Sequence, residues 1–208
     1  MELSYITFMK HAQKVTKTAS SGRPILKGVY HAKDGSLIVT DSHRLYLAKN
    51  AHADASESII DPKTGEKIDG TYPDCSRLLP DKSNAEFIVS LPTKKTLDAF
   101  TTLLKANQVV GKGDERVSIC ERDNNRVVFT AKNLVMEASY DAGVATGKVG
   151  KLTFNTIFMA DALKLFKDVG ATDVEMRYYG ELRPFTLSVG KNDELLVLIA
   201  PIRTVRNS

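Results

Sequence analysis

The first apolar pattern along the chain has the 3.6-residue period of an α-helix. Between about Thr7 and Ala19, one stripe contains Phe8, Ala12, Val15 and Ala19, spaced at i, i+4, i+7 and i+11. Thr7 stands directly before the stripe and is the expected N-cap. The pattern predicts an amphipathic helix with one buried face.

Two further stretches repeat this helical period. One follows Pro92 and Thr93, and the other is expected to begin at an Asn155 cap and to end at Gly170. The apolar stripes are Leu97, Phe100 and Leu104 in the second stretch and Met159, Leu163 and Phe166 in the third.

Each predicted helix is followed by short apolar runs separated by turn residues, which is the pattern of antiparallel strands. The first set occupies residues 28–31, 37–40 and 45–47, with a turn at Lys33-Asp34-Gly35-Ser36. Later sets occupy residues 117–120, 126–130 and 134–140, then 174–178, 185–189 and 195–199. The chain therefore reads as three copies of one helix-plus-strands unit and belongs to the α+β class.

The first and second units are separated by an extra segment, residues 48–86. It is rich in Asp, Ser, Lys, Gly and Pro and contains a turn at residues 61–65. We interpret it as a linker with short hairpins and expect a domain boundary near Pro80. The predicted domains are residues 1–80 and 81–208.

Composition narrows the class of protein. A chain of 208 residues with 42% hydrophobic content can bury a real core. The sequence contains no apolar run of the ~20 residues that a membrane span needs, and no signal-peptide pattern. Cys75 and Cys120 allow a disulfide, but a reduced cytoplasmic protein is the simpler interpretation. We predict no metal site and no cofactor, because metal-ligand spacing and a Gly-rich phosphate loop are both missing.

Lysines occupy the polar sides of all three predicted helices. A row of lysines can follow a phosphate backbone without reading bases, although a solvated helix face is the alternative for any single helix. The candidate DNA-binding residues are Lys10, Lys14, Lys17, Lys94, Lys95, Lys105, Lys164 and Lys167.

Three short pieces, residues 23–26, 40–45 and 200–203, combine Arg, Pro or His with aliphatic residues beside predicted strands. This composition suits a shallow groove that holds a short peptide. Taken singly, His43 fits a hydrogen-bonded residue at a strand start, Arg44 a surface ion pair, and Pro201 the end of an edge strand. The groove prediction depends on their joint occurrence.

These residues carry a family resemblance. The stretches at 23–29 and 39–45 resemble the middle domain of the bacterial DNA polymerase III beta subunit, the sliding clamp. Residues 72–80 are similar to the segment that leads into the last domain of that family. Residues 154–156 with Ala162 and Leu163, followed by residues 198–203, are similar to its C-terminal half.

The resemblance implies a DNA-clamp fold of repeated βαβββ units, with helices on one face and antiparallel sheets on the other. It also implies a groove for a linear motif found in polymerases, clamp loaders and repair proteins. Carried over by motif, the groove residues are Arg23, Leu26, Thr40, Ser42, His43, Arg44, Leu45, Pro73, Leu78, Leu198, Ala200, Pro201, Ile202 and Arg203.

The chain departs from the family in length, with three units where the resemblance implies six. The unit at residues 1–80 looks like half of a clamp domain, so the stripe containing Phe8 and Val15 is expected to lack its sister helix. Two chains could then pair through this stripe, and two such dimers could close a ring. We therefore expect a homo-oligomer, either a dimer or a tetramer.

The sequence leaves three functions to weigh. The first is a processivity factor that binds duplex DNA non-specifically and tethers a polymerase through the groove. The second is a non-encircling decoy or regulator that binds the same motif peptides. The third is an enzyme using Asp41, His43 and Cys75, which we disfavour because nothing brings Cys75 near the other two or supplies an oxyanion site.

Overall fold

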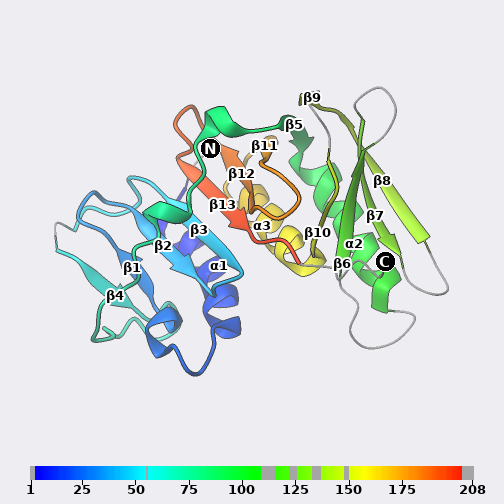
Figure 1. Cartoon of the computed structure of the whole chain (residues 1–208). Helices are drawn as coiled ribbons and strands as arrows, with labels where there is room; N and C mark the ends of the chain where they lie inside the picture. Colours follow the sequence, from blue (N-terminus) through cyan, green and yellow to red (C-terminus); the bar gives the residue numbers. More distant parts are fainter. Residues whose placement is uncertain are drawn as a thin grey trace.

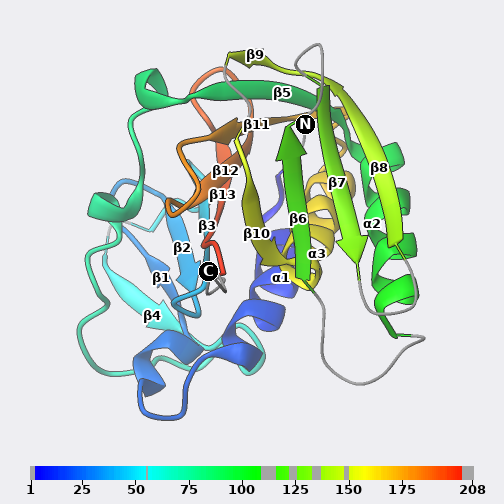
Figure 2. The same ribbon diagram turned by 45° about the vertical axis from the view of Figure 1, so that its right-hand side comes forward.

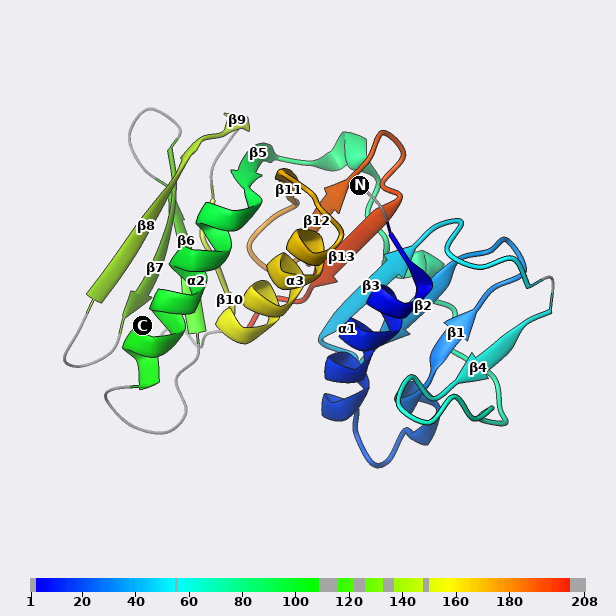
Figure 3. The ribbon, with the colours of Figure 1, turned by 180° about the vertical axis from the view of Figure 1, so that it is seen from behind.

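The computed structural model describes residues 3–54, 56–108, 116–121, 126–132, 137–147 and 150–202. Its long helices are α1 (Tyr5–Thr18), α2 (Thr93–Gln108) and α3 (Thr156–Asp168). All three lie on the same side of the sheets, as the view from behind shows (Figure 3). The α+β class with helices on one face and antiparallel strands on the other is confirmed.

The larger sheet has nine strands in the order β4-β1-β2-β3-β13-β12-β11-β5-β9, all antiparallel to their neighbours (Figure 1). Its strands are β1 (Val29–His31), β2 (Leu37–Thr40), β3 (Arg44–Ala48), β4 (Ser58–Ile60), β5 (Phe87–Pro92), β9 (Thr146–Gly147), β11 (Asp173–Tyr178), β12 (Phe185–Val189) and β13 (Leu195–Ile199). The first and third predicted units thus share one sheet, joined where β3 pairs with β13. The predicted boundary near Pro80 stays a prediction.

The smaller sheet has the order β10-β6-β7-β8 and lies in front of α2 (Figure 2). Its strands are β6 (Arg116–Glu121), β7 (Arg126–Lys132), β8 (Glu137–Val144) and β10 (Leu152–Asn155). Strands β6, β7 and β8 overlap the three strands predicted after the second helix, whereas β10 was not predicted as a strand. Residues 134–136 of the third predicted strand lie outside the described residues. The turn expected between β6 and β7, residues 122–125, lies outside the described residues.

Helix α1 begins earlier than the sequence predicts. Ser4 is the N-cap, because its extended backbone places Oγ where it accepts the N–H of Thr7 at 3.1 Å. The prediction of Thr7 as cap is therefore wrong. Thr7 is the third residue of the helix, and its own hydroxyl lies 2.8 Å from that of Ser4.

The apolar stripe of α1 is buried, which corrects the expectation that it is bare. Phe8, Ala12 and Val15 are each 0% exposed and belong to the main core, in contact with the nine-stranded sheet. Helix α3 packs beside α1. Asp168 Oδ2 on α3 lies 2.8 Å from Nε2 of His11 on α1 and accepts a hydrogen bond when this nitrogen carries the proton. The stripe therefore offers no surface for a second chain, and the pairing expected through it has no basis.

Helix α3 agrees with the prediction at both ends. Asn155 is its N-cap, with Oδ1 accepting the N–H of Ile157 at 2.9 Å, and Gly170 follows the helix with φ of +75°. Met159, Leu163 and Phe166 are all fully buried.

Replacing the Asn155 cap by alanine is expected to lower the free energy of unfolding by about 1 kcal/mol, because one N–H of the first turn loses its acceptor. Urea denaturation followed by circular dichroism measures the change. Asn192→Ala, in an exposed turn, is the matched control and should leave stability within about 0.5 kcal/mol. An equal loss in both variants would contradict the assignment of the cap.

A second apolar cluster lies on the sheet face away from the helices. In β3 and β13, Tyr46 and Val197 point into the main core, while Leu45, Leu47, Leu196 and Leu198 point outward. The segment between β4 and β5 crosses this outward face (Figure 1) and adds Tyr72 and Cys75 to the cluster. We call residues 71–79 of that segment the connector. Both faces of the sheet are therefore apolar here, and the candidate site lies between the sheet and the connector.

Candidate functional site

The turn between β2 and β3 is organised by Asp41. Its Oδ1 accepts the backbone N–H groups of His43 and Arg44, both at 2.9 Å. Thr40 adds two bonds, since Oγ1 accepts the N–H of Ser42 at 3.1 Å and donates to the carbonyl of Arg44 at 2.7 Å. The turn holds Ser42 at φ of +77°, a conformation that favours glycine. These hydrogen bonds fix the side chains of the turn at the start of β3.

Arg44 is placed differently from the groove prediction. The residue is 2% exposed, and its guanidinium donates to Asp41 Oδ2 at 3.1 Å and to Asp161 Oδ2 on α3 at 2.9 Å. It also donates to the carbonyl of Lys14 on α1 and lies 4.4 Å from the ring centre of Phe158. Burial works against the charged form, but these contacts outweigh it and keep the pKa of Arg44 above its ordinary value. Arg44 thus ties the turn to the helices, and it is not among the residues that line the two pockets beside residues 71–79.

Two adjacent pockets flank the connector. The first has a volume of about 660 Å³ and brings together six of the predicted groove residues. Ile25 and four further connector residues complete its lining. The predicted residues in it are Arg23, Leu26, Thr40, Ser42, Pro73 and Leu78.

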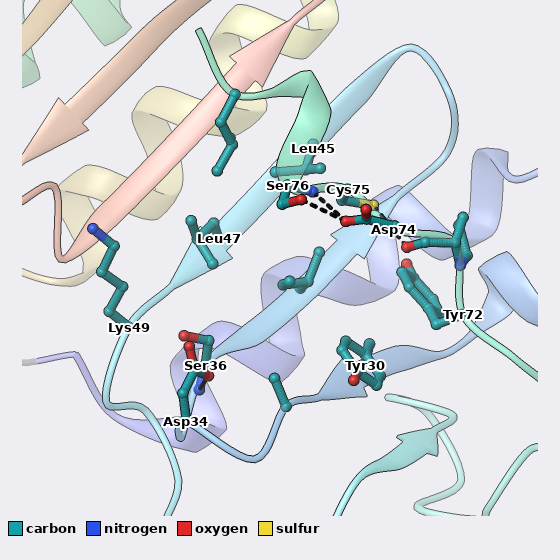
Figure 4. Close-up of a pocket in the computed structure, with 14 residues that line it drawn as sticks. Tyr30, Asp34, Ser36, Leu45, Leu47, Lys49, Tyr72, Asp74, Cys75 and Ser76 are labelled. Carbon is teal, nitrogen blue, oxygen red and sulfur yellow. Dashed lines mark hydrogen bonds between the residues drawn. The ribbon is translucent and has the colours of Figure 1, made fainter. Parts of the chain in front are cut away.

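The second pocket, about 460 Å³, lies on the outward face of β1, β2 and β3 (Figure 4). Its lining includes Leu45 and Leu47 from β3, while Lys49 and Asp34 lie at the end opposite Tyr72. Most of the lining is apolar. An apolar pocket with one polar end suits an extended segment that buries an aliphatic side chain.

The connector forms the wall that both pockets share, through Tyr72, Pro73, Asp74 and Cys75. The Tyr72 hydroxyl accepts the N–H of Thr40 at 3.1 Å, and its ring stacks on Tyr30 with centres 5.4 Å apart. These contacts hold the connector on the sheet. The two pockets are therefore neighbours, with the connector between them.

Cys75, together with Asp41 and His43, does not form a catalytic set. The Asp41 carboxylate is taken up by the turn and by Arg44, and the His43 ring stacks near Phe158, with centres 6.4 Å apart. Burial raises the pKa of the Cys75 thiol to about 11, so it stays protonated at neutral pH. The Cys75 thiol is therefore not prepared for nucleophilic attack at neutral pH.

The remaining predicted groove residues do not line the first pocket. Leu45 lines the second pocket, and Leu198 joins Leu26 and Leu45 in the outward apolar cluster. Ala200, Pro201 and Ile202 are half-buried. The N–H of Ala200 donates to the carbonyl of His43 at 2.8 Å, and that of Ile202 donates to the carbonyl of Thr153 at 2.7 Å. Arg203 lies outside the described residues.

We call the side of the molecule formed by α1, α2 and α3 the helix face. Most of the candidate DNA-binding lysines are exposed on it. Lys14 is the exception, because its ammonium pairs with Asp161 at 2.5 Å. The Asp161 carboxylate is paired with Arg44 and Lys14, which reduces the negative charge presented by α3. The exposed lysines are Lys10, Lys17, Lys94, Lys95, Lys105, Lys164 and Lys167.

Sequence reasoning missed several residues of the site. Tyr30, Ile38, Leu47 and Tyr72 line the second pocket, but they were read only as strand or connector residues. Cys75 lines it too and was considered only as a disulfide partner or a nucleophile. One available signal was the unbroken apolar run of β3 and of β13, since a strand apolar on both faces must be covered on both. Asp41 was considered only as a catalytic acid, whereas it organises the turn.

Within the part of the chain that the structure describes, no helix is long and apolar enough to cross a membrane. Among the same residues, no group of three or more His, Cys, Asp or Glu side chains is arranged to hold a metal ion.

No protein family model matches the chain. Among curated proteins, it is 27% identical over 230 residues to the beta sliding clamp of Staphylococcus epidermidis and 28% identical over 234 residues to that of Staphylococcus aureus. Each match covers 90% of this chain and 59% of the relative. The chain thus spans 59% of the length of these relatives.

Solved structures agree with this likeness. The DNA polymerase sliding clamp from Bacillus subtilis superposes with a TM-score of 0.79 and 19% identity, covering 96% of this chain and 63% of its own. The DNA polymerase III beta chain from Streptococcus pneumoniae gives a TM-score of 0.79, 20% identity and the same coverage. The resemblance to the sliding clamp, and the clamp fold that it implied, are confirmed.

Proposed function

We propose that this chain is a sliding-clamp-like processivity factor, which binds duplex DNA non-specifically through its helix face and tethers replication proteins through the pockets beside the connector. The partners are linear motifs in proteins of the DNA polymerase and clamp-loader type. Neither role requires a cofactor or a reaction at the site.

The observation that carries the proposal is the placement of two different surfaces on opposite sides of one sheet. Helices α1, α2 and α3, which carry the exposed lysines, lie on one side, and the connector lies on the other (Figures 1 and 3). The pockets lie on the outward face, beside the connector. A protein that held DNA on one side could therefore hold a peptide on the other without competition. This arrangement fits a tether between DNA and an enzyme.

The helix face suits a backbone contact. Its lysines are exposed on three helices, and long flexible ammonium side chains meet phosphates without a fixed geometry. Such contacts release counterions, so the affinity should depend strongly on salt and little on sequence.

The pockets suit an extended peptide with apolar anchors. The first pocket offers Leu26 and Leu78 as apolar walls, with Arg23 donating to Ser42 at 3.3 Å on the polar side. The second adds Leu45 and Leu47 on the far side of Tyr72. Two apolar anchors with polar groups between them would fix both the register and the direction of a bound peptide.

Replacing Leu78 by glutamate is expected to weaken binding of a fluorescent peptide carrying the clamp-binding motif at least tenfold, since a charge would enter the apolar wall. Leu78 is 53% exposed, so the fold should tolerate the change. Fluorescence anisotropy measures the affinity. Leu182→Glu, at a position 67% exposed and outside both pockets, is the matched control.

Equal peptide binding by the Leu78→Glu and Leu182→Glu proteins would contradict the proposal that the peptide binds in the pocket lined by Leu78. Full-strength peptide binding by the wild-type chain without any affinity for duplex DNA would instead indicate the decoy or regulator and would exclude the processivity role. The DNA measurement is argued in the Discussion.

A further inference from the structure

The second pocket combines an apolar lining with acidic residues at both ends. Ile38 and Tyr30 line it from the sheet and are only partly buried, so an apolar side chain that entered the pocket would bury them further. Asp34 follows β1 and lies at one end, whereas Asp74 lies on the connector at the end near Tyr72 (Figure 4).

Asp34 presents an exposed carboxylate. Its Oδ1 accepts the N–H of Ser36 at 2.9 Å, and within the described residues the carboxylate forms no ion pair. Lys49 lines the same end of the pocket, but its ammonium donates to the carbonyl of Asn192 at 2.6 Å, in the turn between β12 and β13. Asp34 therefore leaves a negative charge at this end for a cationic ligand.

Asp74 presents a second carboxylate, on the connector. Its Oδ1 accepts the hydroxyl of Ser76 at 2.6 Å and the N–H of the same residue at 2.9 Å. These hydrogen bonds hold the pKa of Asp74 below its ordinary value, so the group is ionised at neutral pH. Its Oδ2 lies 3.5 Å from Nε of Arg77, but both side chains are mostly exposed, and such a pair gives way easily to another partner.

The surroundings of the pocket are acidic as well. Residues 51–80, which include β4 and the connector, contain six Asp or Glu and three Lys or Arg, although the whole chain carries a net charge of +4. The side of the molecule that holds the pocket therefore attracts cations and repels phosphates. A basic partner is complementary to it.

We propose that the second pocket binds an aliphatic side chain with a lysine or arginine on either side of it in the sequence of the partner. The inference rests on the proposed function, since it specifies which of the two apolar anchors of a bound peptide enters this pocket. The partners then carry a short basic-aliphatic segment next to the clamp-binding motif that the first pocket holds.

The geometry of an extended chain sets the spacing within this segment. Side chains two residues apart project to the same side, about 7 Å from one another. When the aliphatic residue enters the pocket, basic residues two positions before and after it point toward the same surface. Long lysine or arginine side chains can then reach Asp34 at one end and Asp74 at the other.

Peptide extensions test the proposal. A fluorescent peptide carrying the clamp-binding motif is extended at either end, through a flexible Gly-Ser linker, by Lys-Ser-Leu-Ser-Lys or by Glu-Ser-Leu-Ser-Glu. At one of the two ends, the lysine extension should tighten binding to the wild-type chain about tenfold, measured by fluorescence anisotropy. The glutamate extension should give no gain, because its carboxylates would face those of Asp34 and Asp74.

Charge reversal at the pocket should reverse this preference. Asp34→Lys is expected to bind the glutamate extension more tightly than the lysine extension. Asp34→Asn keeps an acceptor for the N–H of Ser36 and should reduce the preference for lysine without reversing it. Asp173→Lys, at an exposed position outside both pockets, is the matched control and should keep the wild-type preference. Circular dichroism checks that the variants fold.

Methyl resonances in nuclear magnetic resonance spectra locate the extension without any variant. Those of Ile38 and Leu47, in the second pocket, should shift only with the lysine extension, whereas those of Leu26 and Leu78, in the first pocket, should shift with the unextended peptide too. If the motif peptide bound but neither extension changed its affinity, the inference would be overturned and the proposed function would stand. A preference for lysine that Asp34→Lys left unchanged would also overturn it. Failure of every peptide to bind would overturn both.

Discussion

Replacing Asp41 by alanine is expected to lower the free energy of unfolding by about 3–5 kcal/mol, because the buried guanidinium of Arg44 loses a buried partner. Asp41 and Arg44 are 3% and 2% exposed, and their side chains meet at 3.1 Å. The same change also leaves the backbone N–H groups of His43 and Arg44 without their acceptor and removes one of the acceptors available to the Thr18 hydroxyl. Urea denaturation followed by circular dichroism gives the measurement.

Asp41→Asn is the matched control, since its amide oxygen can still accept the two N–H groups. Its NH₂ group, however, would meet the Nε–H of Arg44, donor against donor. We therefore expect a loss between that of the alanine variant and the wild type. A loss below 1 kcal/mol for Asp41→Ala would show that the turn does not depend on this carboxylate.

The Asp41→Ala variant should also bind the motif peptide less tightly under conditions where it is still folded. The turn sets the positions of Thr40 and Ser42, which line the first pocket, and of Leu45, which lines the second. If the variant lost stability but kept its peptide affinity, the turn would not be needed to shape the groove.

The local parts of the fold were predictable from the sequence. The Asn155 cap, the stripe of α3 and the hairpin with Gly35 at φ of +81° each depend on residues close together in the chain. The cap of α1 was misplaced because Ser4 and Thr7 are both good caps, and the extended backbone at Ser4 decides between them.

The position of Arg44 could not be predicted in the same way. Its partner Asp161 lies 117 residues further along the chain, on a helix of another unit. Whether an arginine at a strand start faces a groove or the helices depends on which carboxylate the folded chain brings beside it. The family resemblance implied a groove, but it did not show on which face of the sheet the Arg44 guanidinium lies.

The stripe of α1 shows the same limit. Phe8, Ala12 and Val15 predicted an apolar face correctly, but the expectation of a missing sister helix left that face bare. In the structure the nine-stranded sheet covers it and α3 packs beside it. Amphipathic spacing shows that a face needs a partner, and it does not show which partner the chain provides.

Reversing three exposed charges on the helix face, Lys10→Glu with Lys17→Glu and Lys167→Glu, is expected to weaken duplex binding on the order of 100-fold at physiological salt. Each lost phosphate contact also lowers the slope of log affinity against log salt by about 0.9, so the slope should fall by up to about 2.7. Lys14 is left unchanged, because its pair with Asp161 contributes to the contact between α1 and α3. Fluorescence anisotropy with a labelled duplex at several salt concentrations measures both quantities.

The matched control reverses three exposed charges on strand-connecting turns, Lys33→Glu with Arg183→Glu and Lys191→Glu, which changes the net charge equally. If only total charge attracted DNA, the two triple variants would lose affinity alike, and the helix face would have no special role. A large loss confined to the helix variant, with peptide binding unchanged in both, separates the DNA surface from the groove. Because the two surfaces lie on opposite sides of the sheet, each should be removable without the other.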